Sequence, residues 1–218
     1  MDNLFVYFLQ APATGNDPVV CKGAEQILNS LGDSINFQKI SHQSEEQRDL
    51  IELHQPLRIF TLGCSPQFEV TPITYLNQKY NQDFLVIWFD IRGYPFFTDP
   101  AFSQLDLNQI ILAGVNDLGQ SITTTSCHEL KNGQLIYKIL KKAKKNIYIH
   151  LNLNVLDPQE LGSASRPDEN GIPFEALISQ IFQVKKDFNI VGISIVEAPT
   201  MTQYQLDKVN KLVLKTFE

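Results

Sequence analysis

Short runs of almost wholly apolar residues alternate along the chain with longer segments whose apolar residues recur every three or four positions. The short runs predict β-strands at 4–9, 35–40, 58–62, 84–90, 109–115, 146–153 and 190–197. The longer segments predict helices at 21–32, 44–54, 67–80, 129–145, 172–187 and 202–217. Pro72 falls inside the third helix, so we expect an irregular first turn there.

Strict alternation of strand and helix predicts parallel pairing, right-handed crossovers and helices on both faces of the sheet. The strands are nearly all apolar, which is typical of a sheet covered on both faces. No repeat or linker interrupts the 218 residues, of which 43% are hydrophobic, enough for one sizeable core. The sequence therefore predicts one α/β domain over 1–218, a three-layer α/β/α sandwich with a mainly parallel sheet.

The amino-acid composition limits the classes of partner and the cellular compartment that we expect for this protein. A formal net charge of −6 argues against nucleic acid or an anionic membrane as the main partner. Cys21, Cys64 and Cys127 are far apart and odd in number, which suits neither a disulfide framework nor a zinc site. With no signal-peptide pattern and no apolar run of membrane length, we expect a cytoplasmic protein.

Ligands of such sheets bind beyond the carboxyl ends of the strands, so the residues that follow each strand carry the functional information. None of these segments contains a dinucleotide fingerprint or a P-loop. In "IYIHLNLNVLDP" (147–158), His150, Asn152 and Asn154 stand two apart at the end of a predicted strand. At strand spacing they share one face, so we expect all three to point into the same space.

Four strand ends, in order, resemble those of the ureohydrolase family, which comprises arginase, agmatinase and formiminoglutamase. They are "RIFTLGCSPQ", "DFLVIWFDIRGY", "NIYIHLNLNVLDP" and "IVGISIVEAP". The resemblance covers most of the chain and implies an arginase-like fold. It also implies the family's chemistry, in which two manganese ions generate a hydroxide that attacks a guanidinium carbon.

The same resemblance implies that most metal ligands have been lost. Family members hold the two ions with two histidines and four aspartates. The corresponding positions that can be assigned here are Pro66, Asp90, Arg92, Tyr94, Asn152 and Asn154, and only Asp90 keeps the family residue. The glutamate that faces the substrate guanidinium in the family is kept as Glu197.

Charge supports this interpretation. Manganese(II) prefers carboxylate or imidazole donors, and two ions bring four positive charges. At these positions the chain offers one carboxylate, two neutral amides and the permanent cation of Arg92. We therefore expect no metal cofactor, and we expect Arg92 to replace the lost charge by pairing with Asp90, Glu197 or both.

The same residues also have simpler, structural interpretations. Asp90 can be a strand-end turn residue, His150 a hydrogen-bonded core histidine, and Asp157 a turn residue before Pro158. Glu197 can pair with Arg92 or be a remnant of the family's substrate contact.

Two further features have structural explanations. "CHE" (127–129) most simply begins a helix capped by Ser126 or Thr125, and the lysine run 138–145 forms an exposed helix face.

The sequence thus predicts an arginase-fold pseudoenzyme without manganese-dependent hydrolysis. Its remaining role is to bind a small anionic or zwitterionic ligand near Arg92 and Glu197, with Arg166 as a further contact, or to bind a protein partner. Two alternatives stay open. One is a hydrolase acting on C–N bonds of a guanidino or formimino substrate with altered or metal-free chemistry, using Asp90, Glu197 or His150. The other is a structural subunit of an oligomer, including a homo-oligomer.

Overall fold

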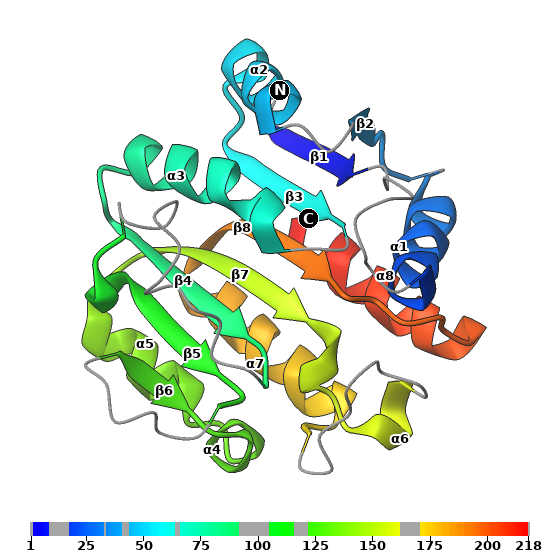
Figure 1. Ribbon diagram of the computed structural model, residues 1–218. Helices are drawn as coiled ribbons and strands as arrows, with labels where there is room; N and C mark the ends of the chain where they lie inside the picture. The colour runs from blue at the N-terminus through cyan, green and yellow to red at the C-terminus, as the bar shows by residue number, and fades with distance from the viewer. Residues whose placement is uncertain are drawn as a thin grey trace.

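Eight parallel strands form one sheet in the order β2-β1-β3-β8-β7-β4-β5-β6 (Figure 1). The structure is a computed structural model that describes residues 2–8, 18–32, 34–40, 44–63, 66–91, 105–115, 122–161 and 171–217. The strands are β1 (Asn3–Phe8), β2 (Gln38–Ile40), β3 (Arg58–Leu62), β4 (Phe84–Phe89), β5 (Ile110–Ala113), β6 (Thr123–Thr125), β7 (Asn146–Asn152) and β8 (Asn189–Val196).

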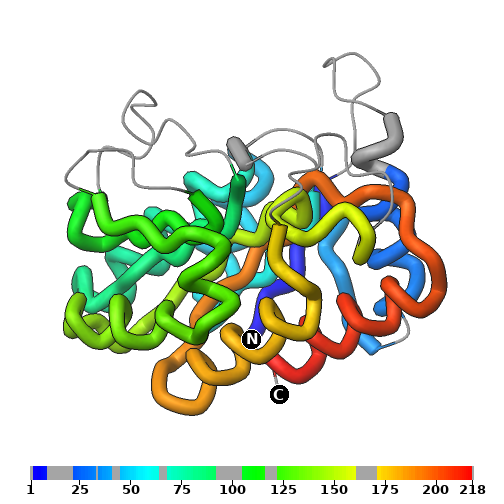
Figure 2. The backbone as a smooth tube through the Cα atoms, turned by 90° about the horizontal axis from the view of Figure 1, so that it is seen from below, coloured from blue at the N-terminus to red at the C-terminus, as the bar shows by residue number. Residues whose placement is uncertain are grey.

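Helices cover both faces of this sheet and bury two hydrophobic cores. One face carries α1 (Pro18–Leu31), α4 (Cys127–Lys131), α5 (Leu135–Lys142), α7 (Phe174–Asp187) and α8 (Gln203–Phe217). The other carries α2 (Ser44–His54) and α3 (Val70–Lys79). Figure 2 shows α7 and α8 side by side on the first face. The predicted three-layer α/β/α sandwich is confirmed.

Alternation along the central strands assigns their side chains to the two cores. In β4, Leu85, Ile87 and Phe89 point to the larger core, whereas Phe84, Val86 and Trp88 point towards α2 and α3. Both sets are buried, because each face has its own helical layer. Among the described residues, no helix is both long and apolar enough to cross a bilayer.

The structure departs from the predicted elements at several points, including the unpredicted short helix α6 (Pro158–Leu161), and two of these departures have a clear physical reason. The helix predicted for 129–145 is two helices, α4 and α5, because the chain turns at Asn132 and Gly133, where Gly133 has φ +72°. The three-residue edge strand β6 was not predicted, since "TTT" carries no apolar run. The irregular start expected around Pro72 is present as a 3₁₀ turn, η1 (Pro66–Glu69), that runs into α3.

Candidate functional site

The carboxyl ends of β4, β7 and β8 are neighbours in the sheet, and polar side chains from all three lie there. Asp90 follows β4 directly, and its backbone N–H donates to Ala113 O at 3.0 Å. Asn152 is the last residue of β7, and its Nδ2 donates to Asp90 Oδ2 at 2.9 Å. Both side chains are almost fully buried, with exposed fractions of 4% for Asp90 and 2% for Asn152. A carboxylate that deep needs such donors.

Asn154 extends this hydrogen-bonded group to the next strand. Strand β7 ends at Asn152, and residues Leu153–Val155 form the 3₁₀ turn η4. Asn152 caps that turn, because its Oδ1 accepts from the Asn154 backbone N–H at 3.0 Å. Asn154 Nδ2 in turn donates to Glu197 Oε2 at 2.5 Å. Asp90, Asn152, Asn154 and Glu197 therefore form one hydrogen-bonded chain, which we call the strand-end cluster.

Glu197 has an unusual backbone conformation. It follows β8 with φ +51°, in the left-handed region that residues other than glycine rarely adopt. This costs on the order of 1 kcal/mol, and such residues collect at ligand sites and switch regions. The conformation and the bond from Asn154 together fix the position of the Glu197 carboxylate.

The expectation that His150, Asn152 and Asn154 share one face by strand spacing holds for the first two residues and not for Asn154. His150 and Asn152 do lie two apart in β7, but Asn154 belongs to the turn that follows. His150 lies in a separate group below the strand ends, where its Nδ1 meets Glu69 Oε1 at 2.7 Å. Glu69 and His150 both have side chains that are 0% exposed.

Glu69 is the centre of this second group, the buried floor. It precedes α3 but makes no side-chain capping bond, and its carboxylate points into the sheet instead. Its Oε2 accepts from Ser194 Oγ of β8 at 2.5 Å. Trp88 of β4 stacks on the His150 ring with centroids 3.4 Å apart. The simpler interpretation of His150, a hydrogen-bonded core histidine, agrees with these contacts.

Tyr148 also belongs to the buried floor. Its hydroxyl lies close to Ser194, Thr61 and Glu69, but not in hydrogen-bond geometry with any residue that the structure describes. Burial raises the pKa of Tyr148 well above its usual range, and the nearby Glu69 carboxylate adds to the effect. Tyr148 therefore stays protonated in the folded protein.

Ser194, His150 and Glu69 do not form a nucleophile triad. In such a triad one ring nitrogen of the histidine meets the acid and the other meets the serine. Here the serine hydroxyl and the carboxylate both approach Nδ1, at 3.4 and 2.7 Å, and Ser194 donates to Glu69. All three side chains are fully buried, which excludes a substrate from the serine.

Sequence reasoning missed Glu69 and Ser194. Glu69 stands in a segment interpreted only as the start of a helix, and Ser194 is one small residue within an apolar strand. The signal that was available is His150 itself, since a buried imidazole needs a polar partner.

Several predicted site residues lie outside the described part of the chain. They are Arg92, Tyr94 and Arg166. The pairing of Arg92 with Asp90 or Glu197 therefore stays a prediction. Pro66 is the first residue of η1, and proline has no side-chain donor atom.

Of the six positions that the resemblance assigns to metal ligands, the structure describes Pro66, Asp90, Asn152 and Asn154, and among these Asp90 is the one carboxylate. A metal ligand must direct a lone pair at the ion, and an amide NH₂ has none to offer. Asn152 and Asn154 each direct Nδ2 at a carboxylate. Turning either amide over would bring its oxygen against a carboxylate oxygen, so the carboxylates select the observed orientation.

The structural interpretations of Cys127 and Asp157 agree with the structure. Ser126 caps α4 in a reciprocal pair with Glu129, so Cys127 begins a helix. Asp157 Oδ1 accepts from the Gln159 N–H in the turn that leads into α6 (Pro158–Leu161).

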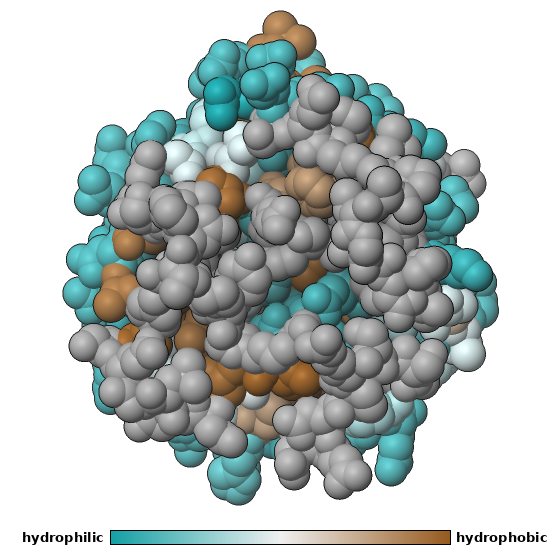
Figure 3. Space-filling view, viewed as in Figure 1, coloured by the Kyte–Doolittle hydropathy of each residue, from teal (hydrophilic) through white to brown (hydrophobic). Residues whose placement is uncertain are grey.

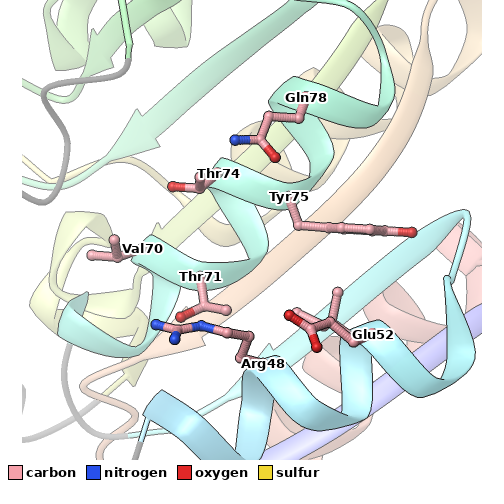
Figure 4. A pocket seen from close by; sticks show the side chains of 8 residues that line it. Arg48, Glu52, Val70, Thr71, Thr74, Tyr75 and Gln78 are labelled. Carbon is pink, nitrogen blue, oxygen red and sulfur yellow. The ribbon is translucent and has the colours of Figure 1, made fainter.

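A separate groove of about 340 Å³ runs between α2 and α3. Arg48 and Glu52 reach into it from α2, opposite Thr71, Tyr75 and Gln78 of α3 (Figure 4). The ligand site predicted from the sequence lies elsewhere, beyond the carboxyl ends of β4, β7 and β8. In the space-filling view, hydrophilic and hydrophobic side chains lie close together near the middle of the face seen in Figure 1 (Figure 3).

Comparison with known proteins supports the fold alone. No family model matches the chain, and no match was found among curated proteins. An arginase structure from Entamoeba histolytica, in complex with L-ornithine, is 15% identical with a TM-score of 0.76, and the match covers 99% of this chain and 98% of that one. Formimidoylglutamase from Bacillus subtilis is 14% identical with a TM-score of 0.73, covering 99% and 85%. Proclavaminate amidino hydrolase from Streptomyces clavuligerus is 12% identical with a TM-score of 0.72, covering 99% and 89%.

These similarities extend over nearly the whole chain and confirm the arginase-like, or ureohydrolase, fold that the strand-end motifs predicted. At such low identity they carry no activity over to this chain.

Proposed function

We propose that this arginase-fold protein lacks manganese-dependent ureohydrolase activity and uses its strand-end site for binding. The observation that supports this most directly is the direction of the two amides. Asn152 and Asn154 each donate to a carboxylate, so one oxygen of each remaining acid is already hydrogen-bonded within the protein. A divalent pair would have to break both bonds and would gain only the carboxylates of Asp90 and Glu197 to set against its four positive charges.

The loss of the metals removes the nucleophile. Without a bound metal ion, water near neutral pH does not supply enough hydroxide to attack a guanidinium carbon. His150 is not a substitute base, because its Nδ1 is held by Glu69 and its ring is buried under the strand ends.

The ligand we propose is a small anionic or zwitterionic molecule near Arg92 and Glu197, with Arg166 as a second cationic contact. Glu197 supports this role through its exposure and its backbone. It is the partly exposed member of the strand-end cluster, and its left-handed conformation holds the carboxylate in place. A protein partner at the same site is the other form of this proposal.

Metal analysis tests the proposal. The purified protein is incubated with excess manganese, desalted and analysed for bound metal by mass spectrometry. The matched control restores all five substituted positions, as Pro66→His, Arg92→His, Tyr94→Asp, Asn152→Asp and Asn154→Asp in one chain. We expect far less than one ion per chain in the natural sequence, whereas about two tightly held ions would refute the proposal.

An activity assay tests whether the chain catalyses the ureohydrolase reaction that the resemblance implies. Arginine, agmatine and formiminoglutamate are each supplied with manganese, and release of urea, ammonia or formamide is followed. We expect no turnover above a mock preparation. Steady turnover that manganese increases would favour the hydrolase alternative.

A further inference from the structure

The groove of about 340 Å³ between α2 and α3 is lined by both charged and apolar side chains, and we call it the α2–α3 groove. Arg48 and Glu52 stand one helical turn apart and share one side of α2, because they are spaced at i and i+4. Ile51, Val70 and the Tyr75 ring supply its apolar surface. Ligand sites usually measure about 300–1,000 Å³, so this groove suits a small molecule.

The two charged groups of the groove are both available to a ligand. Arg48 and Glu52 are exposed, and neither forms an ion pair with the other or with any further residue that the structure describes. Figure 4 shows the Arg48 guanidinium pointing towards Thr71, in the first turn of α3, while the Glu52 carboxylate stands further along the groove. The α2–α3 groove therefore has a positive end, where Thr71 adds a hydroxyl donor, and a negative end.

The apolar wall of the groove is held in place by its own contacts. Tyr75 Oη donates to Pro56 O at 2.9 Å. Lys79 Nζ lies 5.4 Å from the centroid of the Tyr75 ring and donates to Gln55 O at 3.3 Å. Ile51 is 2% exposed and belongs to the hydrophobic core beneath the groove. The wall is thus formed before any ligand binds, as is usual in small-molecule sites.

The opposite charges restrict the class of ligand. A polyanion such as phosphate would be attracted by Arg48 but repelled by the Glu52 carboxylate one turn away, and a simple cation would meet the reverse. A zwitterion satisfies both groups, because its carboxylate accepts from the Arg48 guanidinium while its ammonium donates to Glu52. The apolar wall favours a ligand that carries an apolar group as well.

We propose that the α2–α3 groove binds free zwitterionic amino acids with apolar side chains. Arg48 and the Thr71 hydroxyl hold the ligand carboxylate, Glu52 holds the ammonium, and the ligand side chain packs on Ile51 and Tyr75. No member of the strand-end cluster lines this groove, which lies between the two helices that cover one face of the sheet. It is therefore a second site, separate from the one proposed above.

Equilibrium dialysis with labelled ligands tests the ligand class. L-leucine carries all three groups, whereas glycine lacks the apolar side chain, isocaproate lacks the ammonium and isoamylamine lacks the carboxylate. We expect saturable binding of L-leucine, and binding of each of the other three that is weaker by about tenfold or more. Absence of saturable L-leucine binding, or an analogue that binds as well as L-leucine, would overturn the proposal.

Neutral substitutions locate the site. Arg48→Gln and Glu52→Gln each remove one charge from the groove and should weaken L-leucine binding by about tenfold. Lys211→Gln on α8 and Asp49→Asn on the other side of α2 are exposed matched controls outside the groove, and should leave binding unchanged. Circular dichroism establishes that each variant is folded.

Glu197→Gln separates the groove from the strand-end site. We expect this variant to bind L-leucine as the natural sequence does, because Glu197 does not line the groove. Loss of binding in Glu197→Gln together with unchanged binding in Arg48→Gln would assign the ligand to the strand ends and overturn the proposal.

Discussion

Replacing Asn152 with aspartate tests the central feature of the strand-end cluster. The substitution keeps the size and shape of the side chain and restores the residue type that the resemblance assigns to this position. It removes one donor only, because the oxygen that accepts from the Asn154 N–H can remain in place. Where Asn152 Nδ2 now donates to Asp90 Oδ2 at 2.9 Å, two carboxylate oxygens would face each other.

The protein can accommodate the two facing carboxylates in two ways, and each way sets an expected loss in the free energy of unfolding. If both acids stay charged, two like charges about 4 Å apart at an effective dielectric near 20 repel by about 4 kcal/mol. If one acid takes up a proton, the cost is about 1.4 kcal/mol for each pH unit above an ordinary aspartate pKa near 3.9. The second route costs about 4 kcal/mol at pH 7 and about 1.5 kcal/mol at pH 5. Asn152→Asp should therefore destabilise the protein at pH 7 and recover more than half of the loss at pH 5.

Urea unfolding at pH 7 and pH 5 measures both values. Asn152→Ala is the control, because it removes the same hydrogen bond without adding charge and should lose about 1–3 kcal/mol with a weaker dependence on pH. Unchanged stability of Asn152→Asp at pH 7 would refute the reasoning. It would mean that a metal ion offsets the added charge, because the predicted pairing of Arg92 with Asp90 supplies one positive charge against two carboxylates and would only reduce the loss.

Three further substitutions test the buried floor. The raised pKa of Tyr148 means that the unfolded chain releases this proton above pH 10.0 while the folded chain retains it, so stability falls as pH rises beyond that value. Tyr148→Phe should remove this part of the alkaline slope in denaturant unfolding and cost little at pH 7; an unaltered slope would contradict the assignment. Gly192→Ala would bring a Cβ within 2.4 Å of the Tyr148 ring, so we expect a loss of about 1–3 kcal/mol, and a neutral result in thermal unfolding would show that the ring can move aside. Glu69→Ala leaves His150 and Ser194 without their shared acceptor and should cost about 3–5 kcal/mol in urea unfolding, with Glu25→Ala on the exposed side of α1 as control.

Most of the fold could be predicted from periodicity because the sheet is buried on both faces. Strands β4 and β8 are apolar at every position or nearly so, and this pattern leaves few other interpretations. Edge strand β6 could not be found in this way, since Thr123–Thr125 is short and its pairing depends on β5 being present. The break between α4 and α5 carried a signal in Asn132-Gly133, but the continuous apolar period on either side concealed it.

The four residues of the strand-end cluster could be predicted from the sequence, but the hydrogen bonds that join them could not. The strand ends identified Asp90, Asn152, Asn154 and Glu197, and the structure joins all four. Strand spacing then assigned His150 to the same group, because it could not anticipate that η1 brings Glu69 over β7 and β8. Contacts between elements distant in sequence are set by packing, which a single sequence does not encode in any local pattern.

The two polar groups show how the strand ends of this arginase-like sheet are hydrogen-bonded by the protein's own side chains. Strands β4, β7 and β8 end side by side, and each must satisfy the polar groups exposed where the ladder stops. In the strand-end cluster, amides at the end of β7 join Asp90, which follows β4, to Glu197, which follows β8. One layer below, Glu69 joins β7 to β8 through His150 and Ser194. Neutral donors satisfy the carboxylate oxygens from within the protein, so the fold is compatible with the proposed loss of the inherited chemistry.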